Sequence, residues 1–482
     1  MMLLIVLLIP LAGAALIALS RRRALMEVFH ALATIATLGA GAAAVAQVYG
    51  GEVLTAAGDL FRVDALSALM VAIITFLGAI AAIYAIGYIR AELDGAPLSR
   101  PRLFFALYHL FVFTMLVAVT ADNLGLMWIA IEGTTLATVF LVNFRQTRTS
   151  LEAAYKYLIL SSVGIALAFI GTALVYYAAA PNSGEIAVNW SALRAAARSL
   201  NPEVMRLAFV FIVIGYGTKA GLAPMHTWLP DAHSEAPAPI SALMSGVLLN
   251  VGLYAIIRFK AVVDVAVGPA FGAGLLLGIG LVSLSVAAAF LVRQRSYKRM
   301  LAYSSVEHIG IICLALGFGG YWGSFGALLH VVNHALSKSL LFILSGNILL
   351  KYHSAEIGEV RGLLHAAPWT GALFLAGTLA LIGLPPFGPF ISEFIIFRAG
   401  LESHPWAASA GMILLVVVFG GMLASVNQML YGAPSEGLAP GDALRLWLAP
   451  IALNFALLLT LGLTMPLSFE AALKQVLQVL GV

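Results

Sequence analysis

The chain consists of long apolar runs of about 20 residues, separated by short polar connections. A helix needs about 20 apolar residues to cross a bilayer. The period-two alternation of a half-buried strand is not visible in any segment. The pattern therefore predicts an all-α polytopic membrane protein with about 14 transmembrane helices. The predicted spans cover residues 2–19, 28–48, 64–89, 103–120, 123–143, 153–180, 204–229, 238–258, 270–292, 301–318, 323–350, 368–399, 406–431 and 447–467.

Two of these spans are unusually long and carry proline near their middle. Pro224 interrupts residues 204–229, and Pro385 and Pro386 interrupt residues 368–399. Because proline removes a backbone donor and clashes with the preceding turn, we expect both helices to break. Non-helical backbone at membrane depth must be buried in protein or line a wet cavity. Breaks five spans apart favour two inverted five-helix repeats with function at broken helices 7 and 12, although two ordinary proline kinks are the alternative.

Composition supports the membrane assignment and excludes several functions. The chain is 62% hydrophobic and 10% charged, with a mean hydropathy of +1.00, whereas soluble domains are about 25% charged. The net charge is only +4 and no long basic run occurs, so nucleic-acid binding has no support. Cys313 is the only cysteine. Iron–sulfur clusters need about four thiolates and a disulfide needs two, so we expect no redox centre, cofactor or metal in this chain.

The charge of the connections predicts the orientation of the spans. Lys and Arg are roughly twice as frequent in the odd-numbered connections as in the even-numbered ones. We therefore expect the odd connections in the cytoplasm and both termini on the outer side of a bacterial or archaeal cytoplasmic membrane. The first run lacks a basic leader and a cleavage site, which favours a retained span over a signal peptide. The tail from Ser468 to Val482 is mildly amphipathic and is expected at the interface.

Four charged residues lie inside four different apolar runs: Glu132, Lys219, Lys338 and Glu393. A charge at bilayer depth costs between roughly 2.5 and more than 10 kcal/mol, so four such residues indicate function. Burial favours the neutral form of a lysine, which allows proton exchange near neutral pH. The sequence therefore predicts a membrane protein that moves protons. The alternatives are a structural ion pair for Glu132, a snorkelling Lys219 and a helix-end anchor at Glu393.

A row of titratable residues follows one face of the span at 323–350. His330, His334 and Lys338 recur every four residues, over about 12 Å of helix. Imidazoles are suitable proton carriers, so the row predicts a relay where water fills the gaps. Two satisfied core histidines are the alternative, and zinc is disfavoured because no third ligand stands at motif spacing. Glu307 and His308 are candidates for the same relay, with a structural role equally open.

The segment after the first break is also dense in titratable groups. His226, Asp231, His233 and Glu235 fall within ten residues, which in isolation allows a metal site. The two histidines are seven residues apart on a broken backbone, which fixes no ligand geometry. A structural cap with an ion-pair network is the stronger alternative to a proton-transfer role for the histidines. Lys298 and Arg299 are expected as orientation anchors at the cytoplasmic edge, with a channel role open.

Several of these stretches together resemble the antiporter-like subunits of respiratory complex I, the Mrp antiporters and the membrane-bound hydrogenases. The motifs run from Lys219 to Pro237, from Tyr297 to Ser305, from His330 to Gly346 and from Gly383 to Glu393. Within that superfamily, the stretches Ser304–His308 and Ser345–Tyr352 look most like component F of hydrogenase-4.

The resemblance implies a fold and a set of functional residues. It implies N-terminal helices 1–3 at 1–102, a first five-helix repeat at 103–262, a second at 263–431, and helix 14 with the tail at 432–482. It matches Glu132, Lys219, His330, His334, Lys338 and Glu393 to the family's proton path along the membrane midplane. One position departs, because Asn250 stands where many members carry a lysine, and asparagine cannot titrate. Water or His233 is then the candidate link between the two halves.

The function that the resemblance implies is proton translocation without catalytic residues in this chain. Nickel–iron, iron–sulfur or quinone chemistry would belong to partner subunits, namely other membrane subunits and a peripheral redox module of a hydrogenase-4 or formate hydrogenlyase type. The alternative is an Mrp-type Na⁺/H⁺ antiporter or an inorganic-carbon-uptake subunit without a redox partner. A passive scaffold that docks a catalytic arm is a third reading.

Overall fold

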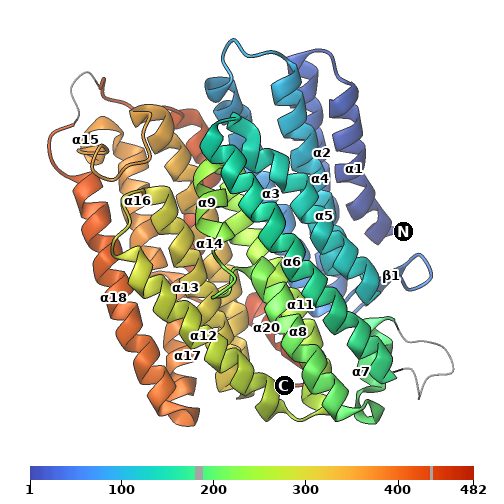
Figure 1. Cartoon of the computed structure of the whole chain (residues 1–482). Helices are drawn as coiled ribbons and strands as arrows, with labels where there is room; N and C mark the ends of the chain where they lie inside the picture. The colour runs from blue at the N-terminus through green and yellow to red at the C-terminus, as the bar shows by residue number, and fades with distance from the viewer. Residues whose placement is uncertain (180–187, 435–437) are drawn as a thin grey trace.

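The computed structural model describes residues 1–179, 188–434 and 438–482, and these are mostly helical (Figure 1). The N-terminal helices are α1 (Met2–Leu19), α2 (Arg23–Tyr49) and α3 (Ala65–Glu92). The next group comprises α4 (Ser99–Thr120), α5 (Leu124–Val142), η1 (Asn143–Arg145), α6 (Arg148–Ala179), α7 (Trp190–Ala195), η2 (Ala197–Ser199), α8 (Pro202–Ala220), α9 (Trp228–Glu235), α10 (Ala238–Leu243), η3 (Met244–Leu248) and α11 (Leu249–Ala266).

The second half of the chain repeats this helical character. It comprises α12 (Pro269–Leu291), α13 (Tyr297–Phe318), α14 (Gly320–Tyr352), α15 (Leu363–Ala366), α16 (Pro368–Leu381), α17 (Gly388–Ser403) and α18 (Pro405–Leu430). The chain ends with η4 (Arg445–Leu448), α19 (Ala449–Leu463) and α20 (Leu467–Leu480). In Figure 1, α1 and α2 stand at one end of the molecule, α18 stands at the other, and α14 lies between them.

Eleven helices of the described residues are long and apolar enough to cross a membrane, or twelve if the bent pair α19–α20 counts as one span. The multi-pass helical fold is thus as predicted, but the count of fourteen is not confirmed. Two of the three remaining predicted spans are divided, and the third is a single short helix. One consists of α8 and α9, one of the short helices α16 and α17, and the last of α19, from which α20 turns away by 80°.

The breaks predicted at the prolines are present. Helix α8 ends at Ala220, and α9 begins only at Trp228, with Pro224 between them. The freed backbone groups find partners: the indole Nε1 of Trp228 donates to the carbonyl of Thr218 at 2.8 Å. The second break lies between the end of α16 at Leu381 and the start of α17 at Gly388. Satisfied backbone at such a break is what membrane depth requires.

A short β-hairpin joins α2 to α3, where the sequence predicted no strand. Its strands, β1 (Leu54–Ala56) and β2 (Phe61–Val63), pair antiparallel with Leu54 opposite Val63. Three residues per strand are too few to produce a readable alternation of polar and apolar positions. The all-α class holds for the membrane-embedded part, and the hairpin corrects it for this connection.

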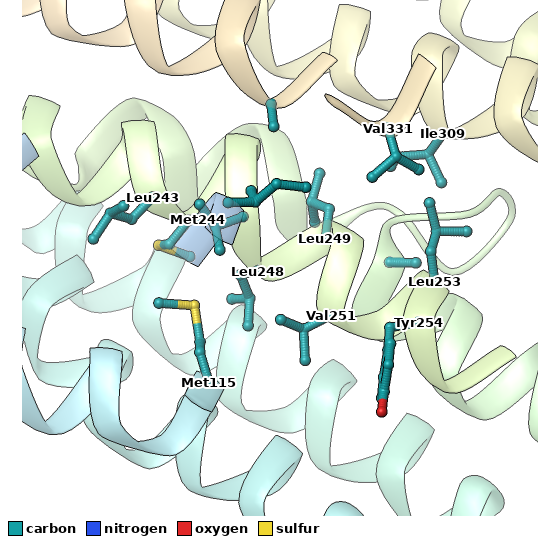
Figure 2. Packing of buried hydrophobic residues seen from close by; sticks show 14 of the residues in the cluster. Met115, Leu243, Met244, Leu248, Leu249, Val251, Leu253, Tyr254, Ile309 and Val331 are labelled. Carbon is teal, nitrogen blue, oxygen red and sulfur yellow. The ribbon is translucent and has the colours of Figure 1, made fainter. Parts of the chain in front are cut away.

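Apolar packing surrounds the helix formed by α10, η3 and α11. Figure 2 shows Met115 of α4, Ile309 of α13 and Val331 of α14 beside it, and all three side chains are buried. Every residue from 238 to 259 is buried as well. These apolar contacts and the hydrogen bond of 2.7 Å between Ser245 and Ser305 hold α13 and α14, which carry the second group of titratable residues, against this helix.

A buried ion pair joins the N-terminal helices to α11. Asp64, at the N-cap of α3, accepts two hydrogen bonds of 2.6 Å from the guanidinium of Arg258 and one of 3.1 Å from the backbone N–H of Ser67. Both charged side chains are only 5% exposed. Burial raises the pKa of Asp64, but the facing guanidinium and the Ser67 N–H outweigh burial, so this pKa lies below its usual value.

We expect Asp64→Asn to destabilise the fold by about 3–5 kcal/mol, because it leaves the buried Arg258 charge unpaired. The measurement is the thermal unfolding midpoint in detergent. Wild-type stability from this pair is present above the ordinary aspartate pKa of about 3.9 and is lost as pH falls through the lowered pKa. Arg398→Ala is the control, because that residue makes an exposed pair with Glu402 worth about 0–1 kcal/mol. Equal midpoints for the two variants would contradict this role.

Candidate functional site: a buried line of charged and polar side chains

A hydroxyl group bridges the first two predicted charges. Lys219 of α8 is fully buried, and its Nζ donates to Thr135 Oγ1 of α5 at 2.8 Å. Thr135 in turn donates to Glu132 Oε2 at 3.1 Å. The other oxygen of Glu132 accepts from Ser162 Oγ of α6 at 2.9 Å. Ammonium, hydroxyl and carboxylate thus form one chain of hydrogen bonds across three helices.

Tyr157 of α6 completes the environment of the lysine. Its hydroxyl accepts a second hydrogen bond from Lys219 Nζ at 2.9 Å and shares one of 2.8 Å with Thr138. A snorkelling lysine would point its amine to the membrane surface, whereas this amine donates to two buried hydroxyls, one from α5 and one from α6. Glu132 itself is half-buried, so it is the end of the chain that lies nearest the protein surface.

His233 lies between the two halves of the site. It is fully buried, with its ring 5.2 Å from that of Phe342 on α14 and 6.3 Å from that of Trp228. Trp228 also packs on Tyr157, at 4.7 Å between ring centroids. Both ring nitrogens of His233 lack a hydrogen-bond partner among the described residues. Buried nitrogens of this kind are where ordered water is expected.

The remainder of the segment after the first break forms an ion-pair network. Asp231 contacts Lys156 Nζ at 3.1 Å and Arg299 Nη1 at 2.7 Å. Lys298 is buried and donates to the carbonyls of Ser234 and Ala236 at 2.7 and 2.8 Å. This arrangement matches the structural cap with ion pairs that the sequence offered as the alternative to proton transfer. Lys298 is held inside the protein by its two hydrogen bonds to backbone carbonyls. Among the described residues, no group here could hold a metal ion.

His226 has a place apart from the chain of hydrogen bonds. Its ring lies 6.1 Å from that of Tyr303, and its Nδ1 is buried without a partner in the described part of the chain. The structure therefore gives it no direct bond to Lys219 or His233. Its role in proton transfer stays a prediction.

In the second half, Lys338 of α14 is fully buried and bound to α13. Its Nζ donates to the carbonyl of Leu301 at 3.1 Å and to the hydroxyl of Ser304. Glu307 lies one turn further along α13 and is also buried, and it interacts electrostatically with Lys338. An ammonium, a hydroxyl and a carboxyl group therefore lie close together here, as they do in the first half.

Two histidines from different helices meet beside this lysine. His308 Nδ1 and His330 Nε2 are 2.9 Å apart, and His330 Nδ1 lies 2.8 Å from Ser392 Oγ of α17. His334 lies 5.5 Å from His308 between ring centroids, and neither of its nitrogens has a partner among the described residues. The predicted face of α14 is thus turned towards α13 and α17.

Glu393 lies next to Ser392 at the outer end of this group. One of its carboxylate oxygens, together with one ring nitrogen from each of His308 and His330, forms a cluster whose atoms all lie within 4.8 Å of one another. Glu393 is half-buried and lines a groove of about 700 Å³ along α17 and α18. The line of charged groups therefore has a partly exposed carboxylate at each end, Glu132 and Glu393.

Asn250 is buried at the start of α11. Its Nδ2 donates to the carbonyl of Gly246 at 2.8 Å, and its Oδ1 has no partner within the described residues. The preceding η3 is a π-helical turn, a feature common at functional sites. This side chain takes no part in the hydrogen bonds of either lysine.

Sequence reasoning missed the hydroxyl groups that connect the charges: Thr135, Tyr157, Ser162, Ser304 and Ser392. Thr135 stands three residues after Glu132, and Ser304 three before Glu307. Residues three or four apart share a helix face, so a search for hydroxyls on the faces of the charged residues would have found these two.

Comparisons with known proteins identify the family of the chain. Residues 121–422 match the family model "NADH:quinone oxidoreductase/Mrp antiporter, TM", and residues 60–95 match the N-terminal model of complex I chain 5. A hydrogenase-4 component F homolog of Methylacidiphilum infernorum is 40% identical over 413 residues, which cover 85% of this chain and 86% of that protein.

Solved structures show the same fold. A chain of the archaeal membrane-bound sulfane sulfur reductase superposes with a TM-score of 0.88 at 24% identity, over 98% of this chain and 96% of that chain. A chain of the Mrp complex from Dietzia sp. DQ12-45-1b gives 0.86 at 21% identity, over 99% and 97%. The family model covers more than half of the sequence, and the hydrogenase-4 relative matches along most of its own length. The chain therefore belongs to the NADH:quinone oxidoreductase/Mrp antiporter family of multi-pass membrane subunits.

Proposed function

We propose that this protein is a proton-translocating membrane subunit of a complex I-like assembly of the hydrogenase-4 or formate hydrogenlyase type. The observation that carries the proposal is the buried line of titratable groups, which begins at one half-exposed carboxylate, Glu132, and ends at another, Glu393. Charges at membrane depth are costly, so those that a membrane protein carries there usually mark a functional site. The line includes Lys219 and Lys338, each of which donates to a hydroxyl group that can relay a proton.

Glu132 and Lys219 form the input side of the mechanism. Their charges lie roughly 5–6 Å apart through the Thr135 hydroxyl, so at an effective dielectric near 20 they attract by roughly 3 kcal/mol. When a neighbouring subunit draws away or neutralises the Glu132 charge, that attraction is lost. The proton occupancy of Lys219 then changes more than about a hundredfold, which is enough to release the proton inward.

The released proton passes to the second half through His233. Its unpaired ring nitrogens, and those of His334, are the points at which ordered water joins the path. From Lys338 the proton moves over Glu307 and the pair His308–His330 and leaves at Glu393. Asn250 carries no proton, so His233 with its water serves as the link.

The assembly supplies the energy for this movement. The 40% identical relative is named a hydrogenase-4 component, so we propose partners of the same kind: other membrane subunits and a peripheral redox module that holds the nickel–iron, iron–sulfur or quinone chemistry. We place the protein in a bacterial or archaeal cytoplasmic membrane, with both termini outside. We also propose that residues 103–262 and 263–431 form the two five-helix repeats. Helices 1–3 precede them, and helix 14 follows.

Reconstitution tests the function directly. The assembly is purified through a tag on this chain, its subunits are identified by mass spectrometry, and it is placed in proteoliposomes with a pH dye inside. We expect a redox partner, and an internal pH change when electron donor and acceptor are added. A pH change that needs an imposed Na⁺ gradient and no redox reaction would instead identify an Mrp-type antiporter. If the internal pH changes under neither condition, the protein is a passive scaffold and the proposed function is wrong.

Thr135→Val is expected to slow proton translocation by about 10- to 100-fold. Valine keeps the shape of threonine but removes the hydroxyl that joins Lys219 to Glu132, and a hydrogen bond to a charged group is worth about 1.5–3 kcal/mol. The rate is measured in proteoliposomes per electron transferred. Thr135→Ser restores the hydroxyl and is expected to regain most of the rate. If valine and serine variants perform alike, the hydroxyl does not carry the proton.

A further inference from the structure

Three metal-binding side chains from three helices meet at the outer end of the second half. His308 comes from α13, His330 from α14 and Glu393 from α17, and one donor atom from each lies within 4.8 Å of the other two. Two imidazoles and a carboxylate are a donor set used by zinc proteins that keep the fourth position open. The sequence pattern disfavoured zinc because it showed no third ligand, but here Glu393 supplies that ligand from a separate helix.

The spacing needs little adjustment to accept an ion. His308 Nδ1 and His330 Nε2 are 2.9 Å apart, whereas two nitrogens on one tetrahedral zinc ion lie about 3.3 Å apart. A small outward rotation of either ring therefore opens the site. The carboxylate of Glu393 is the more movable donor, because this residue is half-buried at the edge of a groove.

The outer nitrogen of His330 has hydrogen-bond partners that suit a metal ligand. Its Nδ1 lies 2.8 Å from Ser392 Oγ, which is also within hydrogen-bond distance of Asn333 Nδ2 and of the carbonyl of Pro389. When Nδ1 carries the proton and donates it to the serine, the lone pair of Nε2 is available to an ion. A bonded outer nitrogen is the usual support of a metal-binding histidine.

His308 has an alternative position for its own proton. Its Nδ1 shares a hydrogen bond with His330 Nε2 in which either ring can be the donor, and the backbone carbonyl of Leu381 lies near the His308 ring. When an ion takes Nδ1, the proton moves to Nε2. Two carboxyl groups lie beside the histidines, because Glu307, the neighbour of His308, is buried and interacts electrostatically with Glu393. Glu307 also faces Lys338, so Glu393 is the carboxylate available to a bound ion.

The cluster lies beside a groove on the protein surface. The groove that Glu393 lines continues along α17 past Arg398 to Glu402, next to the end of the helix at Ser403. Nine residues of helix correspond to about 14 Å, roughly half of the hydrocarbon core of about 30 Å. Most of the other lining residues are apolar, so Glu402 and Glu393 are the groups along the groove that attract a cation.

We propose that His308, His330 and Glu393 form a binding site for Zn²⁺ or a similar divalent transition metal, and that the bound ion stops proton transfer at this point. The block of proton transfer rests on the proposed proton path, whereas the metal site does not. The ion holds the lone pair of His330 Nε2 and the carboxylate of Glu393, so neither group can pass on a proton. The ion is an inhibitor here and not a resident cofactor.

Zinc X-ray absorption on the full-length chain in detergent tests the binding without any transport. We expect one bound zinc per chain with two imidazoles and one carboxylate in its shell. His330→Ala and Glu393→Gln should each weaken zinc binding by more than about tenfold. Removing only the hydrogen-bond partner of a metal ligand already lowers the affinity by about tenfold or more. His353→Ala, an exposed histidine at the end of α14, should change nothing. A shell without imidazole, or unchanged binding in both variants, would overturn the site.

Proton transport by the wild-type assembly tests whether the bound ion stops proton transfer. Zinc at the concentration that fills the site should reduce proteoliposome proton translocation at least about tenfold, and a chelator should restore it. Filled sites with undiminished translocation would overturn the block and keep the site. Metal binding in a protein that translocates no protons at all would remove the proposed function and leave the site intact.

Discussion

Lys219→Ala is expected to reduce proton translocation at least about 100-fold while the dye-linked electron transfer of the redox partner continues. A positioned proton carrier typically contributes about 10²- to 10⁴-fold to the step that it serves. The amine of Lys219 donates to the side-chain hydroxyls of both Thr135 and Tyr157. Alanine therefore removes the group that connects Glu132 to the interior. The measurement is the internal pH of proteoliposomes during turnover, together with dye reduction by the same sample.

Two further variants separate transport from folding. Lys219→Met keeps an unbranched chain of similar length, so it fills the space of the lysine without its charge, and we expect the same loss of translocation. Lys474→Ala removes an exposed lysine that pairs with Glu470 on α20, and we expect wild-type rates. If the alanine and methionine variants both fail to assemble with their partners, Lys219 is a structural residue and the proposed path loses its first carrier.

The sequence predicted the elements of this site better than their connections. Long apolar runs predict membrane helices, and prolines inside two of them predict the breaks at 221–227 and 382–387. Both follow from local physics, because a bilayer requires length and proline removes a helical donor. The face shared by His330, His334 and Lys338 also follows from helical spacing alone.

The contacts between helices could not be predicted in this way. The hydrogen bond between His308 and His330 depends on the rotation and height of α13 against α14, which the packing of many apolar side chains decides. The ion pair of Asp64 with Arg258 joins residues 194 positions apart. The position of Glu393 beside two histidines also depends on how three helices pack together. Periodicity gives the face of each helix but not the neighbour that the face meets.

We expect Lys338→Ala to reduce translocation as severely as Lys219→Ala, at least about 100-fold. Lys338 is the second fully buried lysine of the line, and its amine is held by the carbonyl of Leu301 and the hydroxyl of Ser304. Ser304→Ala removes only the hydroxyl, so it should cost less, about tenfold or below. Both rates are measured in proteoliposomes per electron transferred.

The double variant Lys219→Ala, Lys338→Ala shows whether the two lysines act in series. If one proton must pass both, the delays at the two lysines add, so the double variant should be at most about twofold slower than each single variant. Independent paths would instead leave about half of the rate in each single variant, and their losses would combine. Energetic effects at separated sites usually add, so strict non-additivity in translocation has to come from a shared path. Substantial translocation in either single variant would show that protons bypass that lysine and would break the line between Glu132 and Glu393 into unrelated parts.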